Sequence, residues 1–362
     1  MPCHTINDPE KLRAGVYWRA HTLSNGNPMR LMLAPMEGVI DHTMRELLTS
    51  LGGIDRCVTE FVRVTDRLLP PRVFRRFCPE LDSGGTTSSG VPVYLQLLGG
   101  EAQVVADNAS RAAQLGAPGI DLNFGCPAPK VTKICAGAAL MGEPENLVSM
   151  VDGIIQRVDI PVTAKMRLGT GQGANNAFEI CKELEDIGTS RLCVHGRTLR
   201  QRYSGEADWN EIKRIVEAVE VPVIANGDVV DAKSAKLCLE TTHAAGLMIG
   251  RGAIGRPSIF GDIKVGLGWM KEEDLPWIQD LGDEWYERSA IGQAFATRKW
   301  CWDKYIDYSH QSVGLQPRWM QRHAVAFTKG LPGAKKIRNL MHGAPTPEAF
   351  ADAISTYLAA NE

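Results

Sequence analysis

Residues 222–253 read PVIANGDVVDAKSAKLCLETTHAAGLMIGRGA, and this stretch contains the pattern that predicts the fold. It begins with a short apolar run that ends in NGD (226–228). A segment with helical spacing follows over 232–242, and a second apolar run then ends in GRG (250–252). An apolar run, a helix and another apolar run, in this order, predict two buried parallel strands joined by a crossover helix.

The same alternation recurs between residues 30 and 253, and eight strand–helix units predict an α/β fold, a closed (β/α)8 TIM barrel. The alternative is an open, doubly wound sheet, which usually has fewer strands and a GxGxxG turn after the first one. Here the first run ends in APMEG (34–38), which favours the barrel. The eight runs are RLMLAPMEG (30–38), RCVTEF (56–61), VYLQLLGG (93–100), GIDLNFGCP (119–127), VTAKMRLG (162–169), RLCVHGRT (191–198), PVIANGD (222–228) and GLMIGRGA (246–253).

Every run carries, at or near its carboxyl end, residues that are unusual for a protein core. In TIM barrels the carboxyl ends of the strands meet at the face that carries the active site. One polar strand end could be an ordinary structural group, but burying so many charges without a function would be costly. We therefore expect a site built from Met36-Glu37-Gly38, Thr59-Glu60, Gln96, Asn123, Cys126, Lys165, Arg167, His195, Arg197, Asn226-Gly227-Asp228 and Gly250-Arg251.

The two ends of the chain differ in character from its centre. We predict an N-terminal extension over 1–28, a catalytic barrel over 29–262 and an all-helical domain over 263–362. The last segment loses the strand alternation and contains six of the eight tryptophans. Those tryptophans are expected in the helical core rather than on a base-stacking surface. Within this domain, residues 308–347 carry six Lys or Arg and no acidic residue.

Composition excludes several classes of protein. A net charge of −2 excludes a globally basic nucleic-acid binder, although a local basic face remains possible. No apolar run approaches the roughly 18 residues of a membrane span, and no secretory signal is recognisable, so a cytoplasmic location is expected. The nine cysteines are scattered without a CxxC pair, which argues against a disulfide framework and against a metal site.

Two groups of strand-end residues favour a flavin. GRGA (250–253) follows the last strand, where TIM barrels commonly bind a phosphate, and Arg251 would add charge there. Lys165 and His195, on neighbouring strands, would point at a common centre. A cation at that place stabilises the negative charge of a reduced isoalloxazine ring. The alternative for Lys165 is a structural ion pair with a carboxylate such as Asp121.

Cys126 lies in NFGCP (123–127), a Gly-Cys-Pro turn just past a predicted strand. We expect its thiol at the barrel mouth, where it could act as a nucleophile or as an acid. A nucleophile normally needs a nearby base, whereas a proton donor needs only reach and a suitable pKa. An ordinary buried cysteine is the alternative.

Taken together, these motifs resemble the tRNA-dihydrouridine synthases in order and spacing over about residues 30–260. TEFVRV (59–64) and VFRRFCPEL (73–81) look closest to the bacterial subfamily that acts on uridine 16 of the D-loop. The other motifs of the resemblance are LAPMEGVID (33–41), YLQLLGG (94–100), GIDLNFGCP (119–127), AKMRLG (164–169), VHGRT (194–198), VPVIANGD (221–228) and MIGRGA (248–253).

The resemblance implies FMN-dependent reduction of the C5=C6 bond of a tRNA uridine, with NADPH or NADH as the reductant. FMN N5 would deliver a hydride to C6 and Cys126 a proton to C5, while Asn123 and Arg167 would face the uracil. The FMN contacts would be Pro35, Met36, Glu37, Gln96, Lys165, His195, Asn226, Gly227, Asp228, Gly250 and Arg251. The remaining tRNA contacts, expected from the distribution of charge, would come from Arg63, Arg202 and Arg318.

Some positions depart from the family pattern, and other classes of protein compete with it. Cys135 and Ala136 stand where glycines are common, and Met320 stands where a second basic residue is expected beside Arg318. A TIM-barrel flavin oxidoreductase of the dihydroorotate or enoate type, acting on a small molecule, would not need the helical domain. A non-catalytic RNA-binding protein on a decayed barrel would have no reason to keep Lys165 and Cys126 together. The protein is expected to be a monomer.

Overall fold

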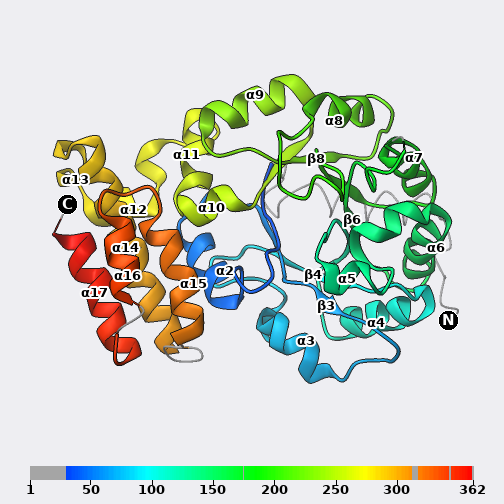
Figure 1. Cartoon of the computed structure of the whole chain (residues 1–362), viewed down its shortest axis with the longest axis horizontal. Coiled ribbons are helices and arrows are strands. Elements are labelled where there is room, and N and C mark those ends of the chain that lie inside the picture. The colour runs from blue at the N-terminus through cyan, green and yellow to red at the C-terminus, as the bar shows by residue number, and fades with distance from the viewer. Residues whose placement is uncertain (1–29, 174, 312–316, 342–343, 361–362) are drawn as a thin grey trace, which may run out of the picture.

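The computed structural model describes residues 30–173, 175–311, 317–341 and 344–360, so the predicted extension over 1–28 lies outside the described residues. Its strands form a closed parallel barrel, as predicted (Figure 1). The strand order is β2-β1-β9-β8-β7-β6-β5-β4, and β4 pairs again with β2, while the short β3 adds to the edge of β4. The strands are β1 (Leu31–Leu33), β2 (Arg56–Val58), β3 (Val62–Arg63), β4 (Val93–Leu98), β5 (Ile120–Phe124), β6 (Val162–Arg167), β7 (Arg191–His195), β8 (Val223–Asn226) and β9 (Gly246–Ile249).

Helices connect successive strands and surround the barrel. The helix predicted over 232–242 is present as α9 (Ala232–Thr242), with the same bounds. Shorter segments fill the long connection after β3 and the loop after β5. The connecting elements are α2 (His42–Ser50), α3 (Pro71–Phe77), η1 (Pro79–Ser83), α4 (Ala102–Gln114), α5 (Pro129–Thr132), η2 (Gly137–Gly142), α6 (Pro144–Ile155), α7 (Ala177–Asp186), α8 (Trp209–Val216), α9 (Ala232–Thr242), α10 (Arg251–Gly255) and α11 (Ile259–Gly266).

Successive strand residues alternate between two different environments. In β5, Ile120, Leu122 and Phe124 join the apolar core between the barrel and its helices. The alternate residues, Asp121 and Asn123, point into the barrel, where they bond to side chains of neighbouring strands. The outward face therefore supplies the packing energy, and the inward face is free to carry polar chemistry.

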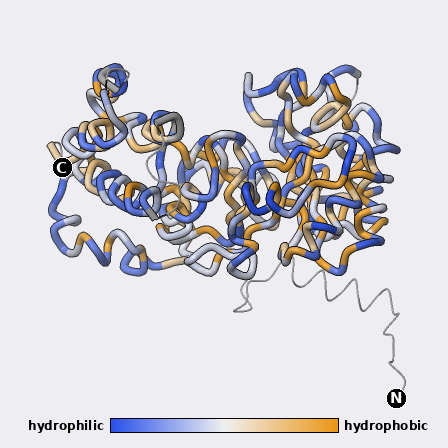
Figure 2. The backbone as a smooth tube through the Cα atoms, turned by 90° about the horizontal axis from the view of Figure 1, so that it is seen from below, coloured by the Kyte–Doolittle hydropathy of each residue, from blue (hydrophilic) through white to orange (hydrophobic). Residues whose placement is uncertain are grey.

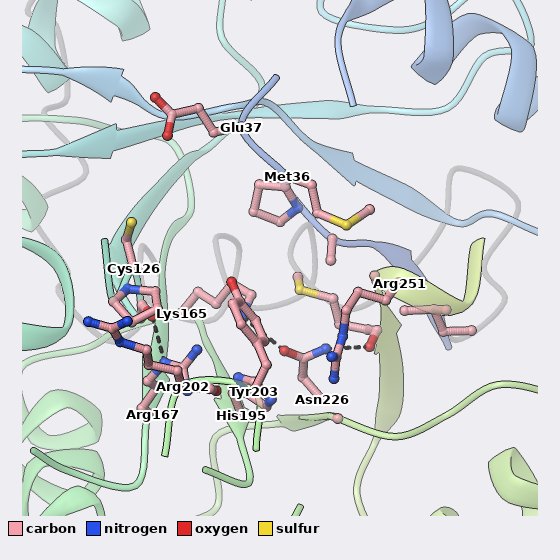
Figure 3. A pocket seen from close by; sticks show the side chains of 18 of the residues that line it. Met36, Glu37, Cys126, Lys165, Arg167, His195, Arg202, Tyr203, Asn226 and Arg251 are labelled. Atoms are coloured by element: carbon pink, nitrogen blue, oxygen red, sulfur yellow. Dashed lines mark hydrogen bonds between the residues drawn. The ribbon is translucent and has the colours of Figure 1, made fainter. Parts of the chain in front are cut away.

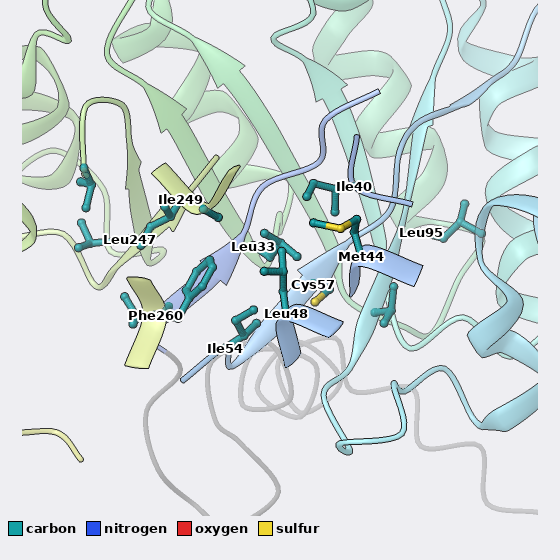
Figure 4. Close-up of a cluster of buried hydrophobic side chains, with 14 of the residues drawn as sticks. Leu33, Ile40, Met44, Leu48, Ile54, Cys57, Leu95, Leu247, Ile249 and Phe260 are labelled. Carbon is teal, nitrogen blue, oxygen red and sulfur yellow. The ribbon is translucent and has the colours of Figure 1, made fainter. Parts of the chain in front are cut away.

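The core between β1, α2 and α11 shows how the outward residues pack (Figure 4). Leu33 of β1 lies against Met44 and Leu48 of α2, and Phe260 of α11 closes the same cluster. All four side chains are almost completely buried. At roughly 25 cal/mol per Å² of apolar area, clusters of this kind supply most of the stabilising free energy of a barrel.

The part of the chain after α11 that the structure describes contains helices only, and these pack directly on the barrel. Helix α14 contacts α2 and α15 contacts α10, so one apolar core runs through both parts. The barrel and these helices lie side by side when seen from below (Figure 2). The elements are η3 (Glu272–Asp274), α12 (Pro276–Leu281), α13 (Glu284–Glu287), α14 (Ala290–Gln311), α15 (Pro317–Thr328), α16 (Ala334–Met341) and α17 (Pro347–Ala359).

The predicted boundary between residues 262 and 263 falls inside α11, and the division into domains stays a prediction. Trp277 and Trp302 are fully buried, as expected for core residues. None of the helices in the described ranges combines the length and the hydropathy that crossing a membrane requires.

A buried ion pair joins α2 to η1. The Arg45 guanidinium donates to both carboxylate oxygens of Glu80 at 2.7 and 2.9 Å, and both side chains are inaccessible to solvent. Burial alone would raise the pKa of Glu80, but Arg45 and His42 outweigh it and lower that pKa from 4.5 to about 2. The pair therefore stabilises the native state wherever Glu80 is ionised.

Replacing Glu80 by Gln should destabilise the protein by about 3–5 kcal/mol at pH 7, because Arg45 is left buried without its counter-charge. A carboxyl with a lowered native pKa contributes stability above its unfolded pKa and loses it as the pH falls. The difference in the free energy of unfolding between wild type and variant should thus become smaller from pH 4.5 towards pH 2. Urea unfolding across this pH range measures it.

Asp82→Asn is the matched control, because Asp82 pairs with Arg75 at 2.7 Å on the surface of the same segment. Exposed pairs contribute at most about 1 kcal/mol. Equal losses of stability in the two variants would contradict the claim that the buried Arg45–Glu80 pair stabilises the protein more than the exposed Arg75–Asp82 pair does.

Candidate active site

The carboxyl ends of the strands open into one cavity of about 750 Å³, within the range of about 300–1,000 Å³ that holds small ligands. Its lining includes every residue predicted to hold the cofactor, together with Asn123, Cys126, Arg167 and Arg202. Arg63 does not line it; its guanidinium donates to the carbonyl of Lys130 at 3.2 Å. Arg318 lies on α15, and its side chain is outside the described residues.

Lys165, on β6, is a buried cation in the cavity wall. Its Nζ donates to Asn226 Oδ1 at 3.0 Å, and Asn226 is itself held by donating to the Met248 carbonyl at 2.7 Å. The alternative ion pair with Asp121 does not form, since Asp121 accepts hydrogen bonds from two uncharged side chains instead. Burial lowers the pKa of Lys165. In the described part of the chain no carboxylate pairs with this ammonium group, which leaves donors for a ligand.

His195, at the end of β7, is uncharged. Burial, followed by the positive charges of Lys165, Arg167, Arg197 and Arg251, lowers its pKa to about 2. Arg197 Nη1 lies 3.3 Å from His195 Nε2. Because a guanidinium can only donate, Nε2 must be the acceptor and the ring proton must lie on Nδ1. His195 is thus a neutral hydrogen-bonding group in a positively charged wall.

Asp228 is an acidic strand-end residue of this cavity, and the protein already uses its charge. Both of its oxygens accept from Arg197 Nη2 at 2.8 Å, and one also accepts from the Ala207 N–H at 2.6 Å. Arg251 Nη2 is 3.8 Å away. Asp228 therefore holds Arg197 at the cavity and lies close to Arg251. The backbone of Asp228 has a positive φ of 58°.

Arg167 is buried and ties two loops together. Its Nε donates to the Gly125 carbonyl at 2.7 Å, and its Nη1 donates to the carbonyls of Thr198 at 3.1 Å and Arg202 at 2.7 Å. The loop that carries Cys126 is thereby linked to the loop after β7. Sequence reasoning predicted a contact with the substrate base here, and the structure adds this bridging role.

The Cys126 turn is held by backbone hydrogen bonds at both of its ends. Asn123 Oδ1 accepts from the N–H groups of Gly125 at 3.1 Å and Cys126 at 2.9 Å, and the Ala138 N–H donates to the Cys126 carbonyl at 3.1 Å. The thiol is half-buried, and burial raises its pKa. It therefore keeps its proton at neutral pH, which suits an acid better than a thiolate nucleophile.

Two residues with polar side chains line the cavity but were not among the predicted site residues. Tyr203 is 55% exposed, and its ring lies between Arg167 (5.4 Å) and Arg251 (5.0 Å). Lys329 follows α15 and reaches the same cavity from the C-terminal helices. The available signals were a lone aromatic residue in the arginine-rich loop TLRQRYSG (198–205) and the acid-free stretch that contains Lys329.

The arrangement fits an elongated, anionic cofactor. Figure 3 shows Cys126 and Arg251 at opposite sides of the pocket, and the ammonium group of Lys165 reaches Asn226. Unpaired donors of Lys165 suit the acceptor edge of a flavin ring, and Arg251 at the start of α10 suits a phosphate. At Gly252 an added Cβ would lie 2.7 Å from the Val229 carbonyl oxygen, so the glycine permits the close backbone packing at the start of α10.

The mouth of this TIM barrel combines a cationic wall with a half-buried thiol. These features define the class of flavin-dependent oxidoreductases. Residues 32–359 match the family described as dihydrouridine synthase (Dus), and the chain belongs to that family. Its members reduce uridine in tRNA with FMN, and NAD(P)H is the reductant. A small-molecule oxidoreductase and a non-catalytic binding protein, the alternatives considered from the sequence, are set aside by this membership.

Three relatives have the name tRNA-dihydrouridine(16) synthase. The protein of Vibrio parahaemolyticus is 48% identical over 313 residues, which cover 86% of this chain and 96% of the relative. That of Salmonella typhimurium is 45% identical over 252 residues, covering 69% of this chain and 79% of the relative. That of Escherichia coli strain K12 is 43% identical over 252 residues, covering 69% and 78%.

The difference between the two thiols of the loop after β5 predicts different reactivity. Cys135 is exposed, whereas Cys126 is half-buried with a raised pKa. At pH 7, iodoacetamide should modify Cys135 first, and modification of Cys126 should increase only as the pH rises, because the thiolate is the reactive form. Peptide mass spectrometry over time measures both rates, with Cys135→Ser as the control. Faster modification of Cys126 at pH 7 would contradict the protonated thiol.

Proposed function

We propose that this chain reduces uridine 16 in the D-loop of tRNA to dihydrouridine. The observation that carries the proposal is the half-buried Cys126 thiol at the mouth of a cationic, flavin-sized cavity. The position in the tRNA is inferred from relatives that span most of this chain and have position 16 in their names.

In this proposal the cavity wall binds and orients the cofactor. When bound, FMN supplies the hydride that reaches C6 of the uracil. Lys165, oriented by Asn226, donates to the acceptor edge of the ring, and neutral His195 supplies a further hydrogen bond. Arg251, held near Asp228, binds the phosphate. The remaining predicted contacts, among them Pro35, Met36, Glu37 and Gln96, line the same cavity.

Cys126 is proposed to supply the proton to C5. Its raised pKa keeps the proton on Sγ until the base arrives. After transfer, the thiolate is stabilised by the positive charges of Lys130 and Arg167, both of which act to lower the pKa of Cys126. The half-buried position then allows water to return the proton.

The tRNA must present its base outside the stack, because a stacked base cannot enter a barrel mouth. Tyr203 offers an exposed aromatic face at the cavity, beside Arg202. Lys329 brings a positive charge from the C-terminal helices to the same opening. Since the whole chain has a net charge of −2, attraction to tRNA depends on such local clusters of cations. The roles of Arg63 and Arg318, the monomeric state and the cytoplasmic location stay predictions.

The proposed function is tested with the FMN-loaded protein, NADPH and an unmodified tRNA transcript. Dihydrouridine should form at position 16 alone, and a transcript with cytidine at that position should contain none. Mapping by mass spectrometry of nuclease fragments measures the product. Dihydrouridine at another position of the D-loop would contradict the assigned target while preserving the family activity, and no dihydrouridine on any transcript would contradict the proposed function.

A further inference from the structure

An unbroken chain of hydrogen bonds runs through the barrel interior and ends at Cys126. Gln96 of β4, Asp121 of β5 and Thr163 of β6 are paired in register on three adjacent strands, so their side chains meet at one level. Asn123 lies two residues beyond Asp121 on β5, on the same face and closer to the mouth.

The contacts in this chain are short. Thr163 Oγ1 donates to Asp121 Oδ1 at 2.5 Å, and Gln96 Nε2 donates to Asp121 Oδ2 at 2.7 Å. Asn123 Nδ2 then donates to Gln96 Oε1 at 2.8 Å, and Asn123 Oδ1 accepts from the backbone N–H of Cys126 at 2.9 Å.

The direction of this chain is set at its two ends. The backbone N–H groups of the Cys126 turn can only donate, so Asn123 must present its oxygen to them. The amide nitrogen of Asn123 therefore faces Gln96 and donates to the Gln96 amide oxygen. The amide nitrogen of Gln96 then points the other way and needs a hydrogen-bond acceptor. A carboxylate accepts and does not donate, and Asp121 fills that place.

Asp121 is 2% exposed, and a buried carboxyl group is costly unless its hydrogen bonds serve another purpose. Burial raises the pKa of Asp121, and its hydrogen bonds from Gln96 and Thr163 and the positive charges of Arg191 and Lys165 oppose that shift. Lys165 itself bonds to Asn226. The proposed chemistry uses Cys126 and the cationic wall, and it leaves Asp121 without a direct part.

We propose that Asp121 is a positioning residue for Cys126: it orients the amides of Gln96 and Asn123, and through them holds the thiol-bearing turn in place. The proposal deepens the proposed function, because a proton donor must be held at a fixed place relative to the base.

The test compares Asp121→Leu with Thr163→Val, each in the FMN-loaded full chain. Asp121→Leu removes the acceptor that orients Gln96, so the Cys126 turn should loosen. Thr163→Val removes the other hydrogen bond to the Asp121 carboxylate. It leaves intact the hydrogen bonds from Asp121 through Gln96 and Asn123 to the Cys126 turn. Thermal unfolding of both variants reports the loss of stability that a merely structural role would produce.

Two readouts are expected to separate the variants. Iodoacetamide should modify Cys126 several-fold faster in Asp121→Leu and at the wild-type rate in Thr163→Val. Oxidation of the NADPH-reduced flavin by tRNA should slow by about tenfold to 100-fold in Asp121→Leu only, because small misplacements of a reacting group have effects of this size. Equal behaviour of the two variants in both readouts would overturn the proposal.

A double variant keeps the proposal testable if Asp121→Leu does not fold. In Asp121→Asn combined with Gln96→Glu, the carboxylate moves from position 121 to position 96. It can still only accept hydrogen bonds, so Asn123 must still donate its amide nitrogen to it. Cys126 should then be modified at the wild-type rate, and faster modification would overturn the proposal. If wild type shows no flavin oxidation by tRNA, the proposed function fails, while the modification rates still decide the role of Asp121.

Discussion

Closure of the barrel is the constraint on which the rest of the structure depends. The pairing of β2 with β4, through Cys57 with Val93 and Val58 with Tyr94, brings the two ends of the sheet together. Eight short parallel strands then deliver their carboxyl ends to a single mouth. Residues that are far apart in the sequence, such as Gln96 and Arg251, line one cavity for this reason alone.

Closure also forces every second strand residue into a narrow interior, where polar groups need partners. Around the candidate site, the described interior residues meet this need with hydrogen bonds between strands. Asp121 bonds to Gln96 and Thr163, and Lys165 bonds to the Asn226 amide. Because Lys165 has an uncharged partner, its charge remains available at the cavity. Asp228, in contrast, neutralises part of the charge of Arg197 and holds that side chain rigid.

Much of the barrel could be predicted from sequence. Apolar runs that end in NGD or GRG predict buried strands followed by turns, and β8 and β9 lie where these runs place them. The polar interior was harder to predict. Lys165 was considered as a partner of Asp121, but the two lie at different levels of adjacent strands, and Asn226 of β8 is the group within reach. Register across strands decides such pairings, and register is not visible in one sequence.

Other parts of the site depend on contacts that sequence patterns do not encode. Lys329 reaches the cavity only because α15 packs against α10, and nothing in its own segment indicates that docking. Arg63 was grouped with the mouth by its place after the second apolar run, yet it does not line the cavity. The exposure of Cys135 was equally hidden, since its neighbours Ile134 and Ala136 are apolar.

The central claim is that one barrel mouth contains two separate functional groups, a cationic wall for the flavin and a protonated thiol for the base. Measuring the two half-reactions in Cys126→Ala tests this most directly, with Cys135→Ala as the control. Reduction of bound FMN by NADPH should be unchanged in both variants. Oxidation of the reduced flavin by tRNA should fall by about 10²-fold to 10⁴-fold in Cys126→Ala only, the usual contribution of a positioned acid. Unchanged oxidation by tRNA in Cys126→Ala, or an equal loss in Cys135→Ala, would contradict the account.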